Sequence, residues 1–190
     1  MKTQLIFDED IPTYKQLLAI LREKDSQQLI RNDSVGHATV LVQNLVEHAE
    51  KEILLYSSSF CEEFYLKEEI LEAFKKKKDL SVKVIIHYKF DEAEDSVGQN
   101  KTIARYNEIL GDHVKIKFMN AEDNLKIEDI SLNNFLVADE KGFRYEKSEP
   151  SKEACVSKGI LPTPAVGSLN DPALSKELAE AFNKKFSQLS

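Results

Sequence analysis

The sequence has few cysteines, no long apolar run and no recognisable leader segment. Its two cysteines, Cys61 and Cys155, are too few for the disulfide framework of a small secreted domain. No stretch of apolar residues is long enough to span a bilayer. No N-terminal segment combines a basic start, an apolar core and a cleavage site. These absences predict a cytoplasmic protein that has no membrane partner.

Basic residues are outnumbered by acidic ones. The chain has 26 Lys and Arg against 33 Asp and Glu, which gives a formal net charge of -7. This balance disfavours strong non-specific binding of nucleic-acid phosphates by a monomer, although it leaves room for a local basic groove. With 42% hydrophobic and 31% charged residues, the composition is that of an average globular protein. The length predicts one domain, residues 35–190, preceded by an N-terminal arm of residues 1–34 that contains a helix.

The motifs that hold common cofactors and metals are also missing. There is no Walker A loop, no GxGxxG, no CxxC and no HxxxH spacing, and basic residues do not interleave with aromatic ones as in RNA-binding modules. The four histidines, His37, His48, His87 and His113, are scattered. His87 and the acidic residues at 91–95 could hold a cation, but a solvated acidic loop is the more usual meaning of such a segment. We expect neither a metal nor a cofactor.

Short apolar runs alternate with amphipathic segments along most of the chain. Segment 35–49 follows an N-cap signal at Ser34 and predicts a largely buried helix. Segment 53–59 is apolar and ends in serines, as expected of a buried strand. Helices are also expected at 14–22, 66–74, 102–111, 152–156 and 172–188, and strands at 5–7, 82–87, 114–118, 135–139 and 143–146. This order predicts an α/β fold with a mixed, mostly parallel sheet sandwiched by helices.

This order of elements, together with the residues around Asp139, resembles one half of the phospholipase D-like superfamily over residues 36–189. The catalytic signature of that family is His-x-Lys-x-x-x-x-Asp, in which the histidine attacks phosphorus and the lysine holds phosphate oxygens. With Asp139 as the signature Asp, the histidine position falls on Leu132 and the lysine position on Asn134. A leucine cannot attack phosphorus, and an asparagine carries no charge to hold a phosphate. The resemblance therefore implies a catalytically silent member, and an enzyme is the less favoured interpretation.

The run Gly167-Ser168-Leu169-Asn170 matches the Gly-Ser-x-Asn element that accompanies the active signature. In active members this element follows the Asp closely, whereas residues 140–166 intervene here. The general preference of Ser, Asn and Asp for N-caps favours a structural explanation. We expect the last strand to end here, and a polar side chain between Ser168 and Asp171 to cap the final helix.

Seven residues are candidates for a degenerate site or a binding surface. The two serines at 57 and 58 follow a predicted parallel strand, where α/β folds place ligands. Arg144 and Glu146 share one face of the predicted hairpin, so that they can pair with each other or contact a partner. The candidates are Asp139, Asn134, Arg144, Glu146, Ser57, Ser58 and His37, the last because it opens the main helix.

Two further features have plain structural explanations. Cys61 precedes a predicted helix, which can lower a thiol pKa, but a nucleophilic cysteine also needs a nearby base. A half-buried free thiol is the more usual role. The four lysines at 75–78 could touch phosphates, but cations at a helix C-terminus also suit the helix dipole.

The preferred function is a non-catalytic domain that acts as a dimeric binding or assembly subunit. Members with one copy of the family's unit resemble halves of a two-fold dimer, so we expect a homodimer. We also expect a protein partner, with the arm of residues 1–34 as the candidate contact.

Two alternatives belong to other classes. One is a phosphodiesterase- or nuclease-type hydrolase whose catalytic groups have been relocated to His37, His87 or His113. The other is a nucleic-acid-binding module derived from a nuclease. It requires the lysines at 75–78 to line one face with Arg105, Lys115 and Lys117.

Overall fold

A computed structural model describes residues 10–32, 34–58, 60–87, 93–120, 123–147 and 164–190. The strand expected at 5–7 and the short helix expected at 152–156 lie outside these residues. None of the helices that the structure describes is long and apolar enough to cross a membrane.

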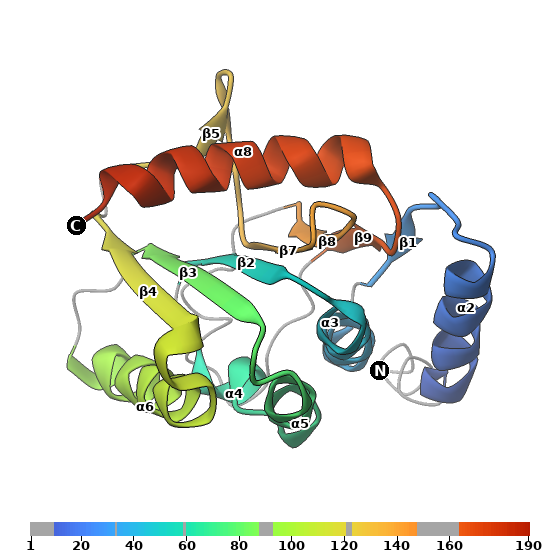
Figure 1. The fold of residues 1–190 in the computed structure, drawn as a ribbon, viewed down its shortest axis with the longest axis horizontal. Coiled ribbons are helices and arrows are strands. Elements are labelled where there is room, and N and C mark those ends of the chain that lie inside the picture. The colour runs from blue at the N-terminus through green and yellow to red at the C-terminus, as the bar shows by residue number, and fades with distance from the viewer. Residues whose placement is uncertain (1–9, 33, 59, 88–92, 121–122, 148–163) are drawn as a thin grey trace, which may run out of the picture.

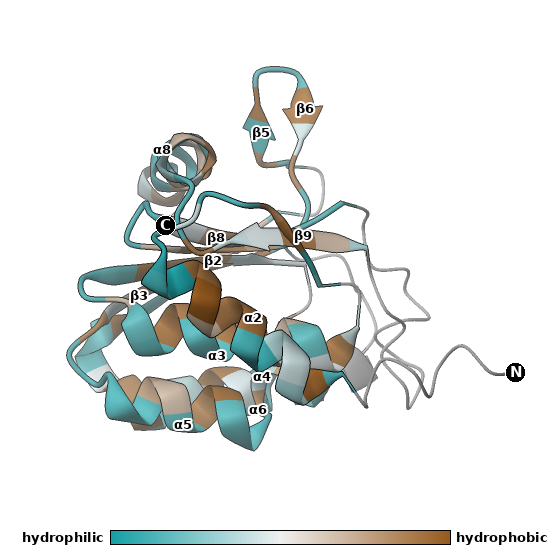
Figure 2. Cartoon of the chain, turned by 90° about the vertical axis from the view of Figure 1, so that its right-hand side faces the viewer, coloured by the Kyte–Doolittle hydropathy of each residue, from teal (hydrophilic) through white to brown (hydrophobic). Residues whose placement is uncertain are grey.

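The centre of the molecule is a seven-stranded sheet with the strand order β1-β9-β8-β7-β2-β3-β4. A separate two-stranded hairpin, β5 and β6, projects beyond it (Figures 1 and 2). The strands are β1 (Ile30–Arg31), β2 (Glu52–Ser57), β3 (Ser81–His87), β4 (Val114–Met119), β5 (Lys126–Ile127), β6 (Ile130–Ser131), β7 (Phe135–Ala138), β8 (Gly142–Glu146) and β9 (Ala165–Ser168).

Helices cover both faces of the sheet (Figure 1). One long helix, α8, lies across one face, and α3 to α6 lie on the other, with α2 beside α3. The helices are α2 (Ile11–Glu23), α3 (Val35–His48), α4 (Glu62–Tyr65), α5 (Glu68–Lys76), α6 (Ala93–Leu110) and α8 (Pro172–Gln188), with a 3-10 turn at Gly111–His113. The α/β class and the sandwich arrangement are thereby confirmed.

The expectation that the sheet is mostly parallel is wrong. β2, β3 and β4 are parallel to one another, but the β2–β7, β7–β8, β8–β9 and β9–β1 pairs are antiparallel. The reason lies in the connections. Helical crossovers join β2, β3 and β4, as parallel pairing requires, whereas β7 and β8 are joined by a tight turn at Asp139–Lys141 that permits only an antiparallel pair.

Each face of the sheet has its own apolar core. Leu41, Leu45, Ile53, Val84 and Phe74 belong to the cluster between the sheet and the helices α2 to α6. Leu54, Ile85, Phe135, Phe143 and Phe182 belong to the cluster beneath α8. Successive residues of β2 enter opposite clusters, because side chains alternate along a strand.

The predicted helix starts are confirmed at two caps. The Ser34 side chain accepts a hydrogen bond from the His37 amide at 3.0 Å, which begins α3. The Asp171 side chain accepts one from the Leu174 amide at 3.1 Å, which begins α8 immediately before Pro172. The Gly-Ser-x-Asn run therefore contains the end of β9, and Asp171, which follows it, caps α8, as expected.

Gly167 also has a structural role in this run. A Cβ at this position would lie 2.5 Å from Leu41 Cδ2 and 2.7 Å from the Phe143 carbonyl oxygen. Because such contacts are too short for real side chains, glycine is required where α3 packs on β9.

Candidate functional site

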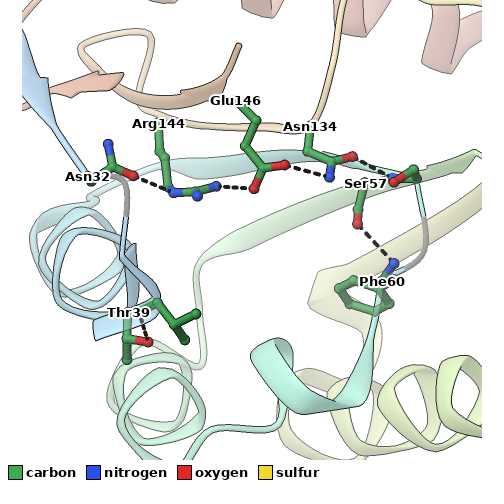
Figure 3. Close-up of polar contacts among 9 residues, drawn as sticks. Asn32, Thr39, Ser57, Phe60, Asn134, Arg144 and Glu146 are labelled. Carbon is green, nitrogen blue, oxygen red and sulfur yellow. Dashed lines mark hydrogen bonds and ion pairs between the residues drawn. The ribbon is translucent and has the colours of Figure 1, made fainter. Parts of the chain in front are cut away.

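Five of the seven candidate residues meet where β2 ends, β7 begins and β8 ends (Figure 3). These residues are Ser57, Ser58, Asn134, Arg144 and Glu146. A sixth residue, Asn32 from the arm, joins them. We call the connected side chains of Asn32, Arg144, Glu146 and Asn134 the Arg144 network.

Asn134 occupies the position of the signature lysine, and both ends of its amide are engaged. Its Oδ1 accepts a hydrogen bond from the Ser58 amide at 2.7 Å. Its Nδ2 donates to Glu146 Oε2 at 2.9 Å. The residue is 9% exposed, so water does not compete strongly for these bonds. Asn134 thus ties the end of β2 to the end of β8.

Arg144 and Glu146 form a mostly buried ion pair. Arg144 Nη1 donates to Glu146 Oε1 at 2.7 Å, and the side chains are 10% and 13% exposed. Arg144 Nε donates to Asn32 Oδ1 at 2.8 Å, and its guanidinium carbon lies 5.8 Å from the centre of the Phe64 ring. The cation that sequence reasoning singled out is therefore held on two sides by the fold itself.

The wall of the site is aromatic. Ser57 Oγ accepts a hydrogen bond from the Phe60 amide at 2.9 Å, and its side chain is also hydrogen-bonded to Tyr65. The Tyr106 hydroxyl donates to the Tyr65 carbonyl oxygen at 3.3 Å. Burial raises the pKa of Tyr65 and that of Tyr106. Both hydroxyls therefore stay neutral at ordinary pH.

Two buried polar atoms at the rim of the site have no hydrogen-bond partner among the described residues. They are Ser58 Oγ and Asn32 Nδ2. Neither carries a charge, so they do not alter the pairing of Arg144 with Glu146.

Leu132, at the position of the signature histidine, does not join this cluster. It is 7% exposed and packs in the apolar cluster beneath α8, together with Met119 and Phe135. The Arg144 network contacts Phe64 of α4, on the opposite side of the sheet. The two positions that carry the signature chemistry therefore do not converge.

Asp139 is also separated from the other candidates, because the four residues of β7 lie between it and Asn134. Its carboxylate accepts three backbone hydrogen bonds: Oδ2 from Glu50 at 2.6 Å, and Oδ1 from Lys51 at 2.9 Å and Glu52 at 2.8 Å. Asp139 and Asn134 therefore flank β7 at its opposite ends. Asp139 instead fixes the turn that leads into β2.

The three histidines of the relocated-enzyme alternative lie apart. His37 stacks on Tyr14 of α2, with ring centroids 4.1 Å apart. His87 is buried at the end of β3, where its Nδ1 lies 3.3 Å from the Tyr56 hydroxyl. His113 is exposed just before β4, at the opposite end of the parallel β3–β4 pair from His87. No two of them form an acid–base pair, and His37 is not part of the Arg144 network.

The positively charged residues of the nucleic-acid alternative do not line one face. Lys117 Nζ donates to the Phe186 carbonyl oxygen of α8 at 3.1 Å, so it lies on the α8 side. Lys75 and Arg105 lie on the helices of the other side, and each pairs with an acidic residue of its own helix, Glu72 or Glu108.

No group of three or more His, Cys, Asp or Glu side chains is positioned to hold a metal within the described ranges. The acidic residues at 91–95, which sequence reasoning paired with His87, lie where side chains are not described. Cys61 is half-buried at the N-cap of α4.

Sequence reasoning missed Asn32 and Tyr65. Asn32 lies two residues before the cap at Ser34 and has no local feature that marks it, and its partner Arg144 lies 112 residues away. Tyr65 stands in an amphipathic segment where nothing marks it as a partner of Ser57. Such pairings depend on the strand order, which no local pattern records.

Comparison with known proteins gives fold neighbours only. No protein-family model matches the chain, and no curated protein sequence is similar to it. Among solved structures, the chain resembles Nuc of Salmonella typhimurium, a phospholipase D family member, with 18% identity, a TM-score of 0.53 and coverage of 86% of this chain and 95% of that one. The chain also resembles NucT from Helicobacter pylori, with 12% identity and a TM-score of 0.56. This similarity covers 85% of this chain and 98% of NucT.

A third solved structure is TrmBL2, an archaeal chromatin protein with a novel mode of DNA binding. It shares 13% identity with a TM-score of 0.55, and the similarity covers all of this chain but only 65% of TrmBL2. Together these likenesses show that the chain has a phospholipase D-like fold.

Proposed function

We propose that this chain is a non-catalytic phospholipase D-like domain that acts as a dimeric binding or assembly subunit. The observation that carries the proposal is the hydrogen bonding of the Asn134 side chain. At the position where the family's lysine holds phosphate, this side chain carries no charge and uses both ends of its amide within the fold.

The surroundings of Asn134 support the same proposal. The neighbouring Glu146 carboxylate would repel a phosphate, and the Arg144 guanidinium beside it is already paired with that carboxylate. Leu132 packs into the opposite core. Covalent phosphoryl transfer requires a nucleophile and a phosphate-holding cation at one place, and the two signature positions supply neither.

The homodimer, the protein partner and the cytoplasmic location are parts of this proposal. Single-copy members of the fold resemble halves of a two-fold dimer, and α2 of the arm carries Leu17 and Ile20 on its exposed side. These residues supply an apolar contact that is small enough for a reversible interface.

Two measurements on one preparation test the proposal. Light scattering should give a mass of twice 21.7 kDa, and assays with a phosphodiester substrate and with single- and double-stranded DNA should show no hydrolysis. A phosphodiesterase with an intact signature serves as the positive control. A monomer would remove the dimeric part of the proposal.

The hydrolase alternative predicts a different result. If hydrolysis occurs and is lost in one of the variants H37A, H87A or H113A, while H48A retains it, the catalytic groups have been relocated and the proposal is wrong. His48 is a suitable control because it is exposed and lies outside this site.

The DNA-binding neighbour supports a second candidate function, the binding of DNA without hydrolysis. Its test is the affinity for a DNA duplex at several salt concentrations. Affinity that falls steeply with salt would favour this candidate, because released counterions drive such binding. The separated lysines and the net charge of -7 lead us to expect no measurable binding at physiological salt.

A further inference from the structure

A small pocket lies at the opposite end of β7 from the Arg144 network. The pocket is open to solvent between the end of α2, the end of α3 and the turn that joins β7 to β8. Its lining includes three basic side chains, Arg22, His48 and Lys141, and an apolar floor that contains Leu45 and Leu169. The Asp139 side chain contributes one edge.

The three basic groups come from three separate elements. Arg22 is in the last turn of α2, His48 is the last residue of α3, and Lys141 is in the β7–β8 turn. The Arg22 guanidinium is positioned by Asn44 Oδ1, which accepts from Nη2 at 2.6 Å and from Nε at 3.2 Å. Partial burial lowers the pKa of Arg22, Asp25 opposes this change, and a guanidinium remains charged in either case.

The acidic groups near the pocket leave the two cations, Arg22 and Lys141, available. Both oxygens of Asp139 are occupied by the backbone amides of residues 50–52. Lys141 is paired with Asp25 at 3.3 Å, but the two side chains are 56% and 70% exposed. An exposed pair of this kind contributes little, so a ligand can replace Asp25 at low cost.

The floor of the pocket restricts the kind of anion that fits. Leu45 and Leu169 are 2% and 4% exposed and offer no side-chain hydrogen-bond donor. A Cβ on Gly142 would lie 2.7 Å from Leu45 Cδ2, so a larger residue here would displace the Leu45 side chain. A phosphate has oxygens on all sides and would lose hydration against such a floor. A carboxylate on an aliphatic stem can place its oxygens at the cations and its carbons on the floor.

We propose that the pocket formed by Arg22, His48 and Lys141 binds a carboxylate carried on a short aliphatic stem, either a small dicarboxylic acid or an acidic side chain of a partner polypeptide. The proposal uses none of the residues at the degenerate site. It therefore holds whether or not the domain is catalytic, and its test involves neither hydrolysis nor the mass of the assembly.

The test is a titration of the full ¹⁵N-labelled chain, at constant ionic strength, with four probes: glutarate, inorganic phosphate, acetyl-Ala-Glu-Ala-amide and acetyl-Ala-Gln-Ala-amide. Glutarate and the Glu peptide should shift the amide resonances of Ala49, Lys141 and Gly142 with saturation, at a Kd of about 1 mM for a single charged contact site. Tighter binding of the peptide indicates a polypeptide ligand, and tighter binding of glutarate indicates a free acid.

Charge-removing variants identify the site. K141Q and R22Q should each weaken the binding of the better acid by about tenfold, the equivalent of one charged hydrogen bond. K115Q, which removes an exposed lysine from β4, should bind as the wild type does. If R22Q does not fold, K141Q decides, because Lys141 is exposed on a turn.

Four results would overturn the proposal. They are an absence of saturable shifts with either acid, equal binding of phosphate, equal binding of the Gln peptide, and a loss of affinity in K115Q that matches the loss in K141Q.

Discussion

The two ends of β7 carry polar groups of the same kinds in opposite states. At the Asn134 end, the Arg144 cation and the Glu146 carboxylate pair with each other and are mostly buried. At the Asp139 end, backbone amides satisfy the carboxylate, so that Arg22 and Lys141 remain at a solvent-open pocket, Lys141 in an exposed pair with Asp25. The comparison shows that the partner of a charged group decides whether the group holds the fold together or remains available to a ligand.

The largest effect is expected from breaking the pair at the Asn134 end. Replacing Glu146 with Ala leaves the Arg144 guanidinium buried without its counter-ion and frees Asn134 Nδ2. We expect a loss of about 3 kcal/mol in the free energy of unfolding, because removing one partner of a buried ion pair leaves the other charge buried without compensation. Urea denaturation measures this loss.

The matched control is Glu108→Ala, which removes the same side chain from the exposed Arg105–Glu108 pair. This change should cost less than about 1 kcal/mol, as is typical of surface ion pairs. Equal losses in E146A and E108A would contradict the view that the Asn134 end is a closed structural network.

A smaller loss is expected at the other end from Asp139→Ala. Three backbone N–H groups lose their acceptor, but they are near the surface and water can replace part of the interaction. We expect a loss of about 2 kcal/mol. Asp139 has φ +54°, which Asn tolerates as well as Asp does, so D139N keeps the backbone preference and one acceptor oxygen.

The free energy of unfolding of D139N should therefore fall by only about 1 kcal/mol relative to the wild type. Hydrogen exchange at the amides of residues 50–52 should accelerate in D139A more than in D139N. If the two variants unfold at the same urea concentration, the carboxylate is not the anchor of this turn.

Measurements at alkaline pH test the burial of the aromatic wall at the Asn134 end. Burial raises the pKa of Tyr106 in the folded state, so above the ordinary tyrosine pKa of about 10 only the unfolded chain loses this proton. The unfolded state then binds fewer protons, and stability falls as pH rises, by about 1.4 kcal/mol per pH unit for this group. Tyr65 adds to the fall in the same direction.

Urea midpoints measured from pH 9 to 11 should fall less steeply for Y106F than for the wild type. The difference in slope isolates Tyr106 from the lysines and other tyrosines that titrate in the same range. Parallel slopes for the two proteins would show that the Tyr106 hydroxyl reaches solvent in the folded state.

The smallest effect on stability is expected at the pocket. K141Q removes one member of an exposed pair and should change the free energy of unfolding by less than about 0.5 kcal/mol. A loss above about 1 kcal/mol in urea denaturation would show that the cations at the Asp139 end hold the structure together, and the contrast between the two ends would disappear.

Local sequence patterns predicted much of the fold. Residues 53–59, 82–87 and 114–118 correspond to β2, β3 and β4, and the caps at Ser34 and Asp171 begin the helices where expected. These features depend on neighbours within a few residues, so the periodicity of apolar side chains records them. The hairpin of β5 and β6 was not predicted, because each strand has only two residues within a polar segment.

The site was less predictable, and for a physical reason. Arg144 and Glu146 lie two residues apart, and the strand period was enough to predict that they share one face, where they form an ion pair. Asp139 and Asn134 are also close in sequence, but the extended strand β7 between them places them at its opposite ends. The Asn32–Arg144 and Ser58–Asn134 bonds require the strand order β1-β9-β8-β7-β2, which long-range packing decides.

The pairing of β1 with β9 also constrains the order in which the chain folds. Ile30 lies opposite Gly167 and Arg31 opposite Val166, so the sheet cannot be closed at this edge until the C-terminal part of the chain is present. β1 and the Asn32 side chain therefore find their partners only when β8 and β9 are in place. Such distant contacts form slowly, because a long loop must close before they stabilise anything. The α2 helix is not subject to this delay, because its buried side packs on α3, the next helix along the chain.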